Sequence, residues 1–426
     1  MVAIFMLGSG PATEAGEDNS QERLNTLRAE IATLQARANK MIVGEKFEAA
    51  ALLHRKIASK LAEAETVRAA LAAKRKTSPE PNIGEIRGAI ARALAWLAKH
   101  QDVDAAGGWD ADNWMKHAPG AKGAGGAHYD IGVTGLALLA FLNSGYTDRG
   151  GHNENPFGRS VRAGLWFLST GQDEDGCFGN RASQHYIYNH IIATNAMVEA
   201  YRRTRNPRFK TPSIKAVKFL LESQNKDSGW RYGVQPGDSD TSVTSWAVHA
   251  LRAAEDAGFE VDRSAFSGAL KWLGRMTNED TGRVGYLRRG SAPARPEGLV
   301  DKFPSESTEA MTAAGLYAKV EAGADPDSLV MQKGAALMLR LPPVWKTERI
   351  DMVYWLYGTR ALWRMQHDRW PEWCATLTKT LLTNQKPDGS WSPDGPWGPD
   401  GGRIYSTAMM AMCLQTVART LPQPGD

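Results

Sequence analysis

Cysteine is scarce in this sequence, and long apolar runs are absent. The chain of 426 residues has three cysteines, Cys177, Cys374 and Cys413, which are far apart and form no CxxC pair. An odd number of widely spaced cysteines excludes a disulfide framework and a CxxC zinc site, so we expect buried free thiols. No apolar stretch approaches the ~20 residues that a membrane-spanning helix needs, so we predict no transmembrane segment.

The charge is also not concentrated in one place. Lysine and arginine are scattered, and the net charge is only +4, which argues against a nucleic-acid partner. Residues 1–10 are apolar but lack a basic start and a cleavage site, as a signal peptide would require. We therefore expect residues 1–20 to be disordered, or to be the remnant of a truncated signal. This favours the cytoplasm, with export as the alternative if the start is truncated.

Residues 21–76 have the pattern of a helical hairpin or coiled coil. Apolar residues such as Leu24, Leu27 and Ile31 recur at spacings of three and four, no proline interrupts them, and Gly44 lies near the middle. Residues 44–65 resemble the UVR motif of bacterial excision-repair proteins. We expect this module to bind a protein partner or to self-associate. Residues 77–84 contain two prolines and are predicted to be a linker.

The remainder of the chain contains a degenerate repeat. Most units have an aromatic or apolar helical segment, then a glutamine, then a glycine followed closely by an aromatic residue. The clearest pairs are Gln101 with Trp109, Gln172 with Phe178, Gln224 with Trp230, and Gln385 with Trp391. A second apolar helical segment follows each loop, and the fifth unit keeps both helices but has lost the loop motif.

Six helix pairs therefore fit between residues 85 and 420. Helix pairs that bury apolar faces only against their neighbours must stack, and six of them can close into a ring. We predict an all-α fold, an (α/α)6 toroid. In its loops the glycine permits a left-handed turn, the glutamine binds free backbone groups, and the rings of Trp109, Trp230 and Trp391 fill gaps between pairs.

This repeat resembles the QW repeat of squalene-hopene and oxidosqualene cyclases, a family related to protein prenyltransferase β subunits. The C-terminal part, residues 351–415, is similar to bacterial proteins with prenyltransferase and squalene-oxidase repeats. The resemblance implies a terpenoid cyclase-like toroid over residues 85–420. Complete triterpene cyclases use two α-barrels, whereas this chain has one, so the resemblance also implies that a large substrate would need another chain or an unusually roomy ring.

The inner helices of such a ring all begin at one end, which makes that mouth the place to look for a ligand. By position it should present several carboxylates, aromatic residues and one histidine. The predicted ligand-binding set is Tyr129, Asp130, Tyr188, Glu309, Asp351, Tyr354 and Tyr405.

Asp238 and Asp240 stand directly before one predicted inner helix. They resemble the D-x-D-D-T-A motif of class II terpenoid cyclases, which implies that Asp240 takes the place of the proton donor. His190 would be its orienting partner. The sequence makes two departures from the motif: Thr241 replaces the last aspartate, and Ser242-Val243 replaces Thr-Ala. The alternative is that Asp240 is a helix N-cap, since aspartate is among the favoured capping residues.

Two functions remain open on the sequence alone. The first is a binding or scaffolding toroid for a hydrophobic or peptide ligand, without cyclase activity, which the degraded motif favours. The second is a class II isoprenoid cyclase that uses Asp240. We expect no metal and no cofactor, because the Asp, Cys and His set of a prenyltransferase zinc site is not found. An apolar chamber that reaches Asp240 would favour catalysis, and a polar or filled ring would favour binding.

Overall fold

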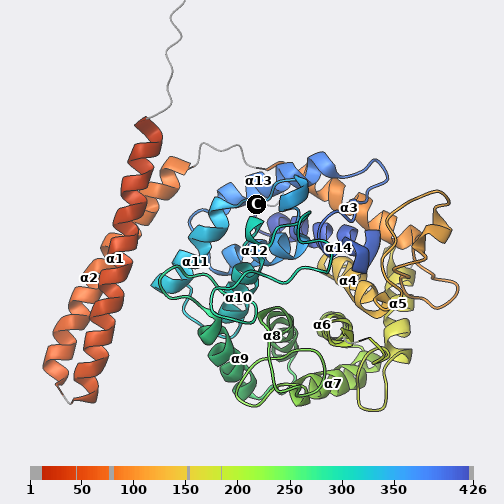
Figure 1. Cartoon of the computed structure of the whole chain (residues 1–426), viewed down its shortest axis with the longest axis horizontal. Helices are drawn as coiled ribbons and strands as arrows, with labels where there is room; N and C mark the ends of the chain where they lie inside the picture. The colour runs from red at the N-terminus through yellow and green to blue at the C-terminus, as the bar shows by residue number, and fades with distance from the viewer. Residues whose placement is uncertain (1–11, 45, 76–80, 151–153, 184, 422–426) are drawn as a thin grey trace, which may run out of the picture. The chain divides into compact units, whose positions relative to one another are not determined.

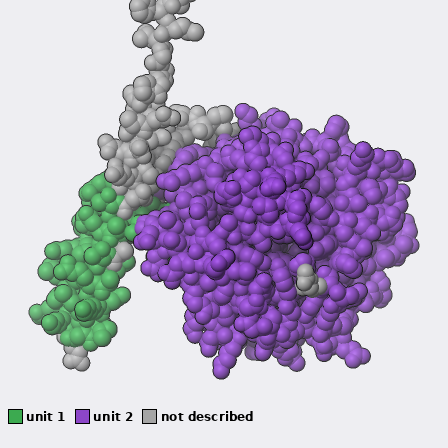
Figure 2. Space-filling model, viewed as in Figure 1, with its two compact units in different colours: residues 1–80, 325–332 green, residues 81–324, 333–426 purple. Residues whose placement is uncertain are grey.

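The computed structural model describes residues 12–44, 46–75, 81–150, 154–183 and 185–421. The chain divides into two compact units, residues 1–80 with 325–332 and residues 81–324 with 333–426 (Figure 2). Within the described ranges there are helices but no strands, and none of those helices is long and apolar enough to cross a membrane.

The first unit contains a helical hairpin. Helix α1 (Ala12–Val43) begins before residue 21, where the sequence analysis starts this module, and packs against α2 (Phe47–Arg75). Ile31, Ala38 and Ile57 form its small apolar core. Residues 1–11, which include most of the segment expected to be disordered or signal-like, lie outside the described residues.

The second unit contains the predicted toroid, with outer and inner helices alternating along the chain (Figure 1). The outer helices are α3 (Ile83–Lys99), α5 (Gly158–Thr170), α7 (Pro207–Glu222), α9 (Arg263–Met276), α11 (Leu329–Arg340) and α13 (Trp370–Asn384). The inner helices are α4 (Asp130–Asn143), α6 (Tyr186–Thr204), α8 (Thr241–Asp256), α10 (Ala310–Glu321), α12 (Met352–Arg364) and α14 (Gly398–Ala418). Short 3-10 turns lie at Trp114–His117 (η1), Ser305–Ser307 (η2) and Thr347–Arg349 (η3).

The ring is closed. Each inner helix packs against the next, and α14 returns to pack against α4 and α3. The Gln385 side chain, after α13, donates a 2.8 Å hydrogen bond to the Ala89 carbonyl of α3. The predicted (α/α)6 architecture is therefore confirmed, since an open solenoid would leave these helices apart.

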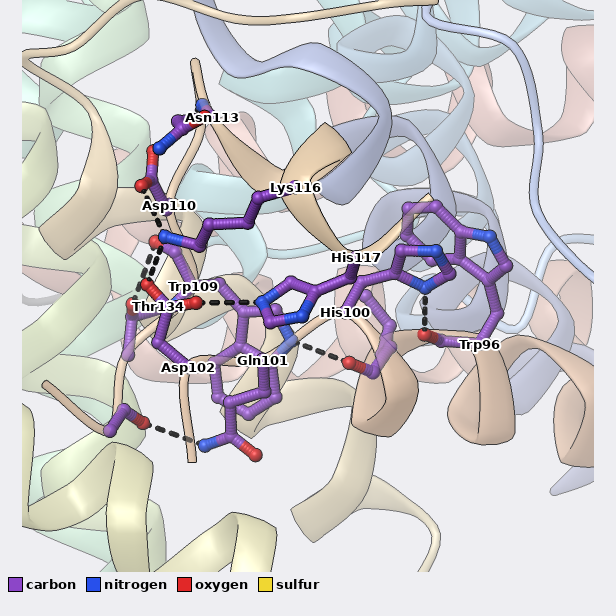
Figure 3. A network of polar contacts seen from close by, with 12 residues as sticks. Trp96, His100, Gln101, Asp102, Trp109, Asp110, Asn113, Lys116, His117 and Thr134 are labelled. Atoms are coloured by element: carbon purple, nitrogen blue, oxygen red, sulfur yellow. Dashed lines mark hydrogen bonds and ion pairs between the residues drawn. The ribbon is translucent and has the colours of Figure 1, made fainter. Parts of the chain in front are cut away.

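The Gly-aromatic loops join neighbouring pairs, as the repeat predicts. Gln101 donates to the carbonyl oxygens of Gly107, in its own loop, and Ser160, in the next outer helix, at 2.7 and 2.8 Å. Figure 3 shows Gln101 and the buried Trp109 ring in this loop. Gly107 has φ +88°, and an added Cβ there would lie 2.7 Å from the Ala163 carbonyl oxygen, so only glycine fits.

Trp109, Trp230 and Trp391 are all fully buried, and the indole N–H of each donates to a carbonyl at the end of the preceding outer helix, at 2.8–2.9 Å. Their predicted structural role is confirmed. The inner helices are buried on nearly every side: eleven residues of α4 are buried. Their N-terminal and C-terminal ends therefore supply the surfaces from which a site can be built.

Candidate functional site

A chamber opens among the N-terminal ends of the inner helices, with a volume of about 150 Å³. Its walls are mainly apolar and aromatic, and we call this space the chamber. The side chains that define it include Tyr129, Val133, Leu136, His185, Tyr188, Ile192, Tyr232, Trp246, Tyr286, Arg295, Met311, Val353, Trp397, Asp400 and Tyr405. A concave apolar space with a few polar groups is the usual form of a small-molecule site.

Asp240 lies just behind the chamber wall and is fully buried. One carboxylate oxygen, Oδ1, accepts a 2.7 Å hydrogen bond from the Val243 N–H, so Asp240 is the N-cap of α8, as the capping interpretation predicts. Burial raises the pKa of Asp240 to about 7, although the Val243 N–H and the charge of Arg231 oppose the shift. The carboxyl group is therefore partly protonated at neutral pH.

The second oxygen of Asp240, Oδ2, connects to the chamber through tyrosines. The Tyr286 hydroxyl lies 3.4 Å from Oδ2, and the Tyr232 hydroxyl lies 2.9 Å from that of Tyr286. Both tyrosines line the chamber, whereas Asp240 itself does not. The Tyr286 hydroxyl is therefore the polar group that stands between Asp240 and the chamber, with the Tyr232 hydroxyl beside it.

The other two predicted acid-base residues are placed differently. Asp238 is exposed and forms an ion pair with Arg231 at the surface. His190 is buried, its Nδ1 accepts from the Phe178 N–H at 3.1 Å, and its Nε2 is 3.2 Å from the Ala216 carbonyl. Burial lowers the pKa of His190 to about 3, so the ring is neutral. The structure gives His190 these main-chain partners in place of the carboxyl of Asp240.

Three members of the predicted ligand-binding set reach the chamber, namely Tyr129, Tyr188 and Tyr405. Tyr354 does not, because its hydroxyl lies in the core, 2.9 Å from both the Met338 and the Leu341 carbonyl oxygens, either of which can accept its single proton. The three carboxylates of the set are likewise engaged elsewhere. The residues of the set lie near the N-terminal ends of the inner helices, but only three of the seven side chains line the chamber.

The three carboxylates of the set, Asp351, Glu309 and Asp130, bind arginine side chains or main-chain N–H groups outside the chamber. Asp351 caps α12 through the Tyr354 N–H and pairs with the buried Arg295 at 3.0 Å. Glu309 pairs with Arg283. Asp130 accepts from the Ala111 N–H at 2.8 Å, and burial raises its pKa to about 6.

Asp130 also belongs to a group that a cation could bridge. Its carboxylate lies within 4.8 Å of those of Asp110 and Asp112. Among the described residues, these three side chains form the cluster that is compact enough to hold a metal ion. Lys116 already pairs with Asp110 at 2.9 Å, as Figure 3 shows, so part of the negative charge is neutralised.

Several chamber residues were missed by sequence reasoning. Asp400 is the one carboxylate among the chamber-lining side chains, and burial raises its pKa, although His185 and Tyr129 oppose the shift. The Tyr129 hydroxyl lies 3.5 Å from Nδ1 of His185. Tyr286 could have been noticed, because it is the aromatic residue of a Gly-aromatic loop. Asp400 gave no signal, because it lies in a Gly- and Pro-rich stretch that reads as a loop.

The sequence comparisons agree with this architecture. The family of squalene-hopene cyclase C-terminal domains matches residues 149–286, a range that includes Asp238 and Asp240. This match covers less than half of the chain and, together with the ring of helix pairs, supports a cyclase-like α-toroid fold. A squalene-hopene cyclase from Zymomonas mobilis is 27% identical over 209 residues, which cover 45% of this chain and 29% of that protein. This chain therefore spans less than a third of the length of that relative.

Solved structures share the fold. The type II terpene cyclase MstE from Scytonema, in a variant complexed with its substrate geranylgeranyl dihydroxybenzoate, superposes with a TM-score of 0.50 and 14% identity. The match covers 80% of this cyclase-like α-toroid chain and 99% of the MstE chain. The apo form of MstE gives a TM-score of 0.49 and 13% identity, over 80% of this chain and 98% of that chain.

Proposed function

We propose that the chamber binds a hydrophobic ligand of isoprenoid type. The observation that carries this proposal is the wall itself, where tyrosine and tryptophan rings from several inner helices face one apolar space. Aromatic faces suit unsaturated chains, and they would also stabilise a cationic group. The MstE variant named above binds a geranylgeranyl compound on a similar fold, which supports the same ligand class.

A peptide is a poorer match for this chamber than a prenyl chain. A bound peptide brings N–H and C=O groups that must each find a partner once water is excluded. Apart from the tyrosine hydroxyls, the polar side chains of the chamber lining are His185, Asn189, Ser242, Arg295 and Asp400. The proposal therefore keeps the hydrophobic ligand and leaves the peptide aside.

The volume of the chamber limits what can be enclosed. A cavity of about 150 Å³ is the size that holds a benzene ring. About one or two isoprene units would fit inside, and a longer chain would extend through the mouth or displace the loop that carries Arg295.

The binding test uses tritiated geranylgeraniol and a matched pair of variants. Val353 lines the chamber, so Val353→Trp should fill it and weaken binding at least tenfold. Val234 is exposed at the surface, and Val234→Trp should bind like the wild type. Equal binding by all three proteins would reject the chamber as the site.

Proton-initiated cyclisation is a second candidate function, and one observation favours it. Asp240 is a buried carboxyl with a pKa of about 7, so a substantial fraction of it is protonated at neutral pH, and Tyr286 and Tyr232 link it to the chamber. Chain length does not oppose this function, because MstE, a type II terpene cyclase, aligns over 99% of its own chain with 80% of this one.

Incubation with geranylgeraniol and with squalene, followed by mass spectrometry, separates the two functions. A cyclised product from the wild type that disappears in Asp240→Asn supports cyclisation, because an amide retains the cap but cannot deliver the proton. Tyr286→Phe should lower the yield if the proton passes through this hydroxyl. Binding without a product in any protein supports the binding function alone.

A further inference from the structure

A second cavity lies at the opposite ends of the same inner helices, with a volume of about 210 Å³. Its walls are polar, and we call it the polar cavity. Its charged lining consists of Glu199, Arg202, Asp256, Glu321, Arg360, Arg364 and Arg419. The neutral polar residues Asn195, Tyr317 and Gln415 also line it, as does His249.

Each acid of the polar cavity already has a basic partner. Glu199 is held by Arg202 and Arg203 at 2.6 and 2.5 Å. Glu321 is 2.8 Å from Arg364, and Asp256 is 3.3 Å from Arg252. No carboxylate of the cavity therefore remains to neutralise a further positive charge.

Arg360 supplies such a charge. It is only 8% exposed, and its Nη1 has no hydrogen-bond partner among the residues that the structure describes. Its Nη2 makes a weak contact, at 3.7 Å, with the sulfur of Met412, and its guanidinium lies over the Tyr317 ring, 5.9 Å from the centroid. Arg360 forms no ion pair with the described residues, and the carboxylate whose charge reaches it, Glu321, already pairs with Arg364. A buried guanidinium without a carboxylate of its own is costly, and water could satisfy its hydrogen bond but not its charge.

Gln415 adds an unpaired acceptor to the same cavity. Its amide nitrogen donates to the Ala140 carbonyl and to the Ser144 hydroxyl, at 2.6 and 2.7 Å, so the amide is held in place. Its Oε1 is buried and has no partner in the described part of the chain. Gln415 lies three residues from Met412, which places both on one face of α14, beside Arg360.

We propose that the polar cavity is a binding site for a small oxyanion that also carries a hydroxyl group, as hydrogen phosphate or a phosphate monoester does. The anionic oxygens pair with Arg360, and the hydroxyl donates to Oε1 of Gln415. The carbonyl ends of the inner helices disfavour an anion, so the site depends on the uncompensated arginine. This site is independent of the chamber and of the function proposed for it.

The test measures the melting temperature of the full chain against inorganic phosphate at constant ionic strength. A ligand that binds only the folded state raises the melting temperature in a saturable way. The wild type should show this rise, with a dissociation constant at least fivefold lower for phosphate than for sulfate, which has no hydroxyl at neutral pH. The absence of a saturable rise with phosphate, or equal affinity for sulfate, would overturn the proposal.

Two variants locate the site. Arg360→Met should raise the dissociation constant for phosphate at least tenfold, while its melting temperature without phosphate stays equal to or above that of the wild type. Arg202→Met is the matched control, because Arg202 lines the same cavity but is paired with Glu199. It should keep the response within about twofold. A full response in Arg360→Met would also overturn the proposal, and Arg360→Lys, which retains the charge, tests it if the methionine variant does not fold.

Discussion

The two ends of the toroid are built from the same helices and yet have opposite chemistry. At the N-terminal ends, the chamber is lined by aromatic rings, and its nearby carboxyls, Asp240 and Asp351, cap helices. At the C-terminal ends, the polar cavity collects arginines. Acidic groups at helix N-termini and basic groups at C-termini both follow the helix dipole. The dipole therefore explains the sign of charge at each end, but not why one end is apolar.

The difference comes from what covers each end. The loops that precede the inner helices contribute Tyr232, Tyr286 and Arg295 to the chamber, so rings from the repeat motif reach its wall. At the other end the connections are short, apart from residues 144–157 between α4 and α5, and the helix ends themselves line the cavity. The loops at the N-terminal ends therefore account for the aromatic wall of the chamber.

The largest expected effect comes from a substitution that weakens the ring of helices on which both ends depend. Trp230→Ala should destabilise the fold by ~3–5 kcal/mol, because it leaves a void where a fully buried ring also anchors the Leu220 carbonyl. Ligand responses at both ends should weaken together near the lowered melting temperature. Denaturant unfolding provides the measurement, and Trp166→Ala, at an exposed ring, should change stability by less than ~0.5 kcal/mol.

The next effect is confined to the chamber end. Arg295→Met should cost ~3 kcal/mol, because Asp351 would be left buried without its partner. The double variant Arg295→Met with Asp351→Asn should recover part of the loss, since the amide still caps α12. Additive losses in this double-mutant cycle would contradict the coupling. Phosphate binding at the polar cavity should be unchanged throughout.

A pH series sharpens the comparison at Asp240. The pKa of Asp240 is about 7 in the folded state and near 3.8 when exposed, so the folded state binds the proton more tightly. The stability that this proton provides is complete below about pH 4 and is lost as the pH rises to about 7. The wild type should therefore lose on the order of 3 kcal/mol relative to Asp240→Asn between pH 4 and pH 8. Parallel stability curves for the two proteins would contradict the shifted pKa.

The smallest effect belongs to the polar end. Arg202→Met should change stability by only ~0.5 kcal/mol, because Glu199 keeps Arg203 as a partner and Arg202 is partly exposed. A loss above ~2 kcal/mol would show that the ion pairs of this end are more tightly coupled than their geometry indicates. Thermal and denaturant unfolding at low and high salt measure the difference.

The fold was predictable because its signals are local. A glutamine, a glycine and an aromatic ring stand within a few residues of one another in most repeat units, and each makes the contact that its chemistry predicts, as Gln101 and Trp109 show. The capping role of Asp240 was equally local, because aspartate precedes a helix and accepts from the third residue after it.

The site was less predictable because its contacts are long-range. His190 was assigned to the mouth by its register along α6, but its ring points sideways to the Ala216 carbonyl. Arg295 meets Asp351 from a long loop, and no spacing in the sequence encodes that meeting. Asp400 comes from the start of α14, before a break in helical geometry at Gly402, φ 62°, where the sequence analysis expected no helix. Side-chain direction and loop path depend on tertiary packing that one sequence does not display.

The hydrogen bond from Gln385 to the Ala89 carbonyl joins the last outer helix of the toroid to the first. Because the last outer helix lies against the first, the ring has no structural beginning, and the place where the polypeptide enters it is arbitrary. If the first and last helices of the toroid were joined covalently, the chain could be opened between any other outer and inner helix. Every helix would keep the same neighbours in the ring. The toroid can therefore be circularly permuted, and each choice of opening changes which helix pair docks last during folding without changing the native ring.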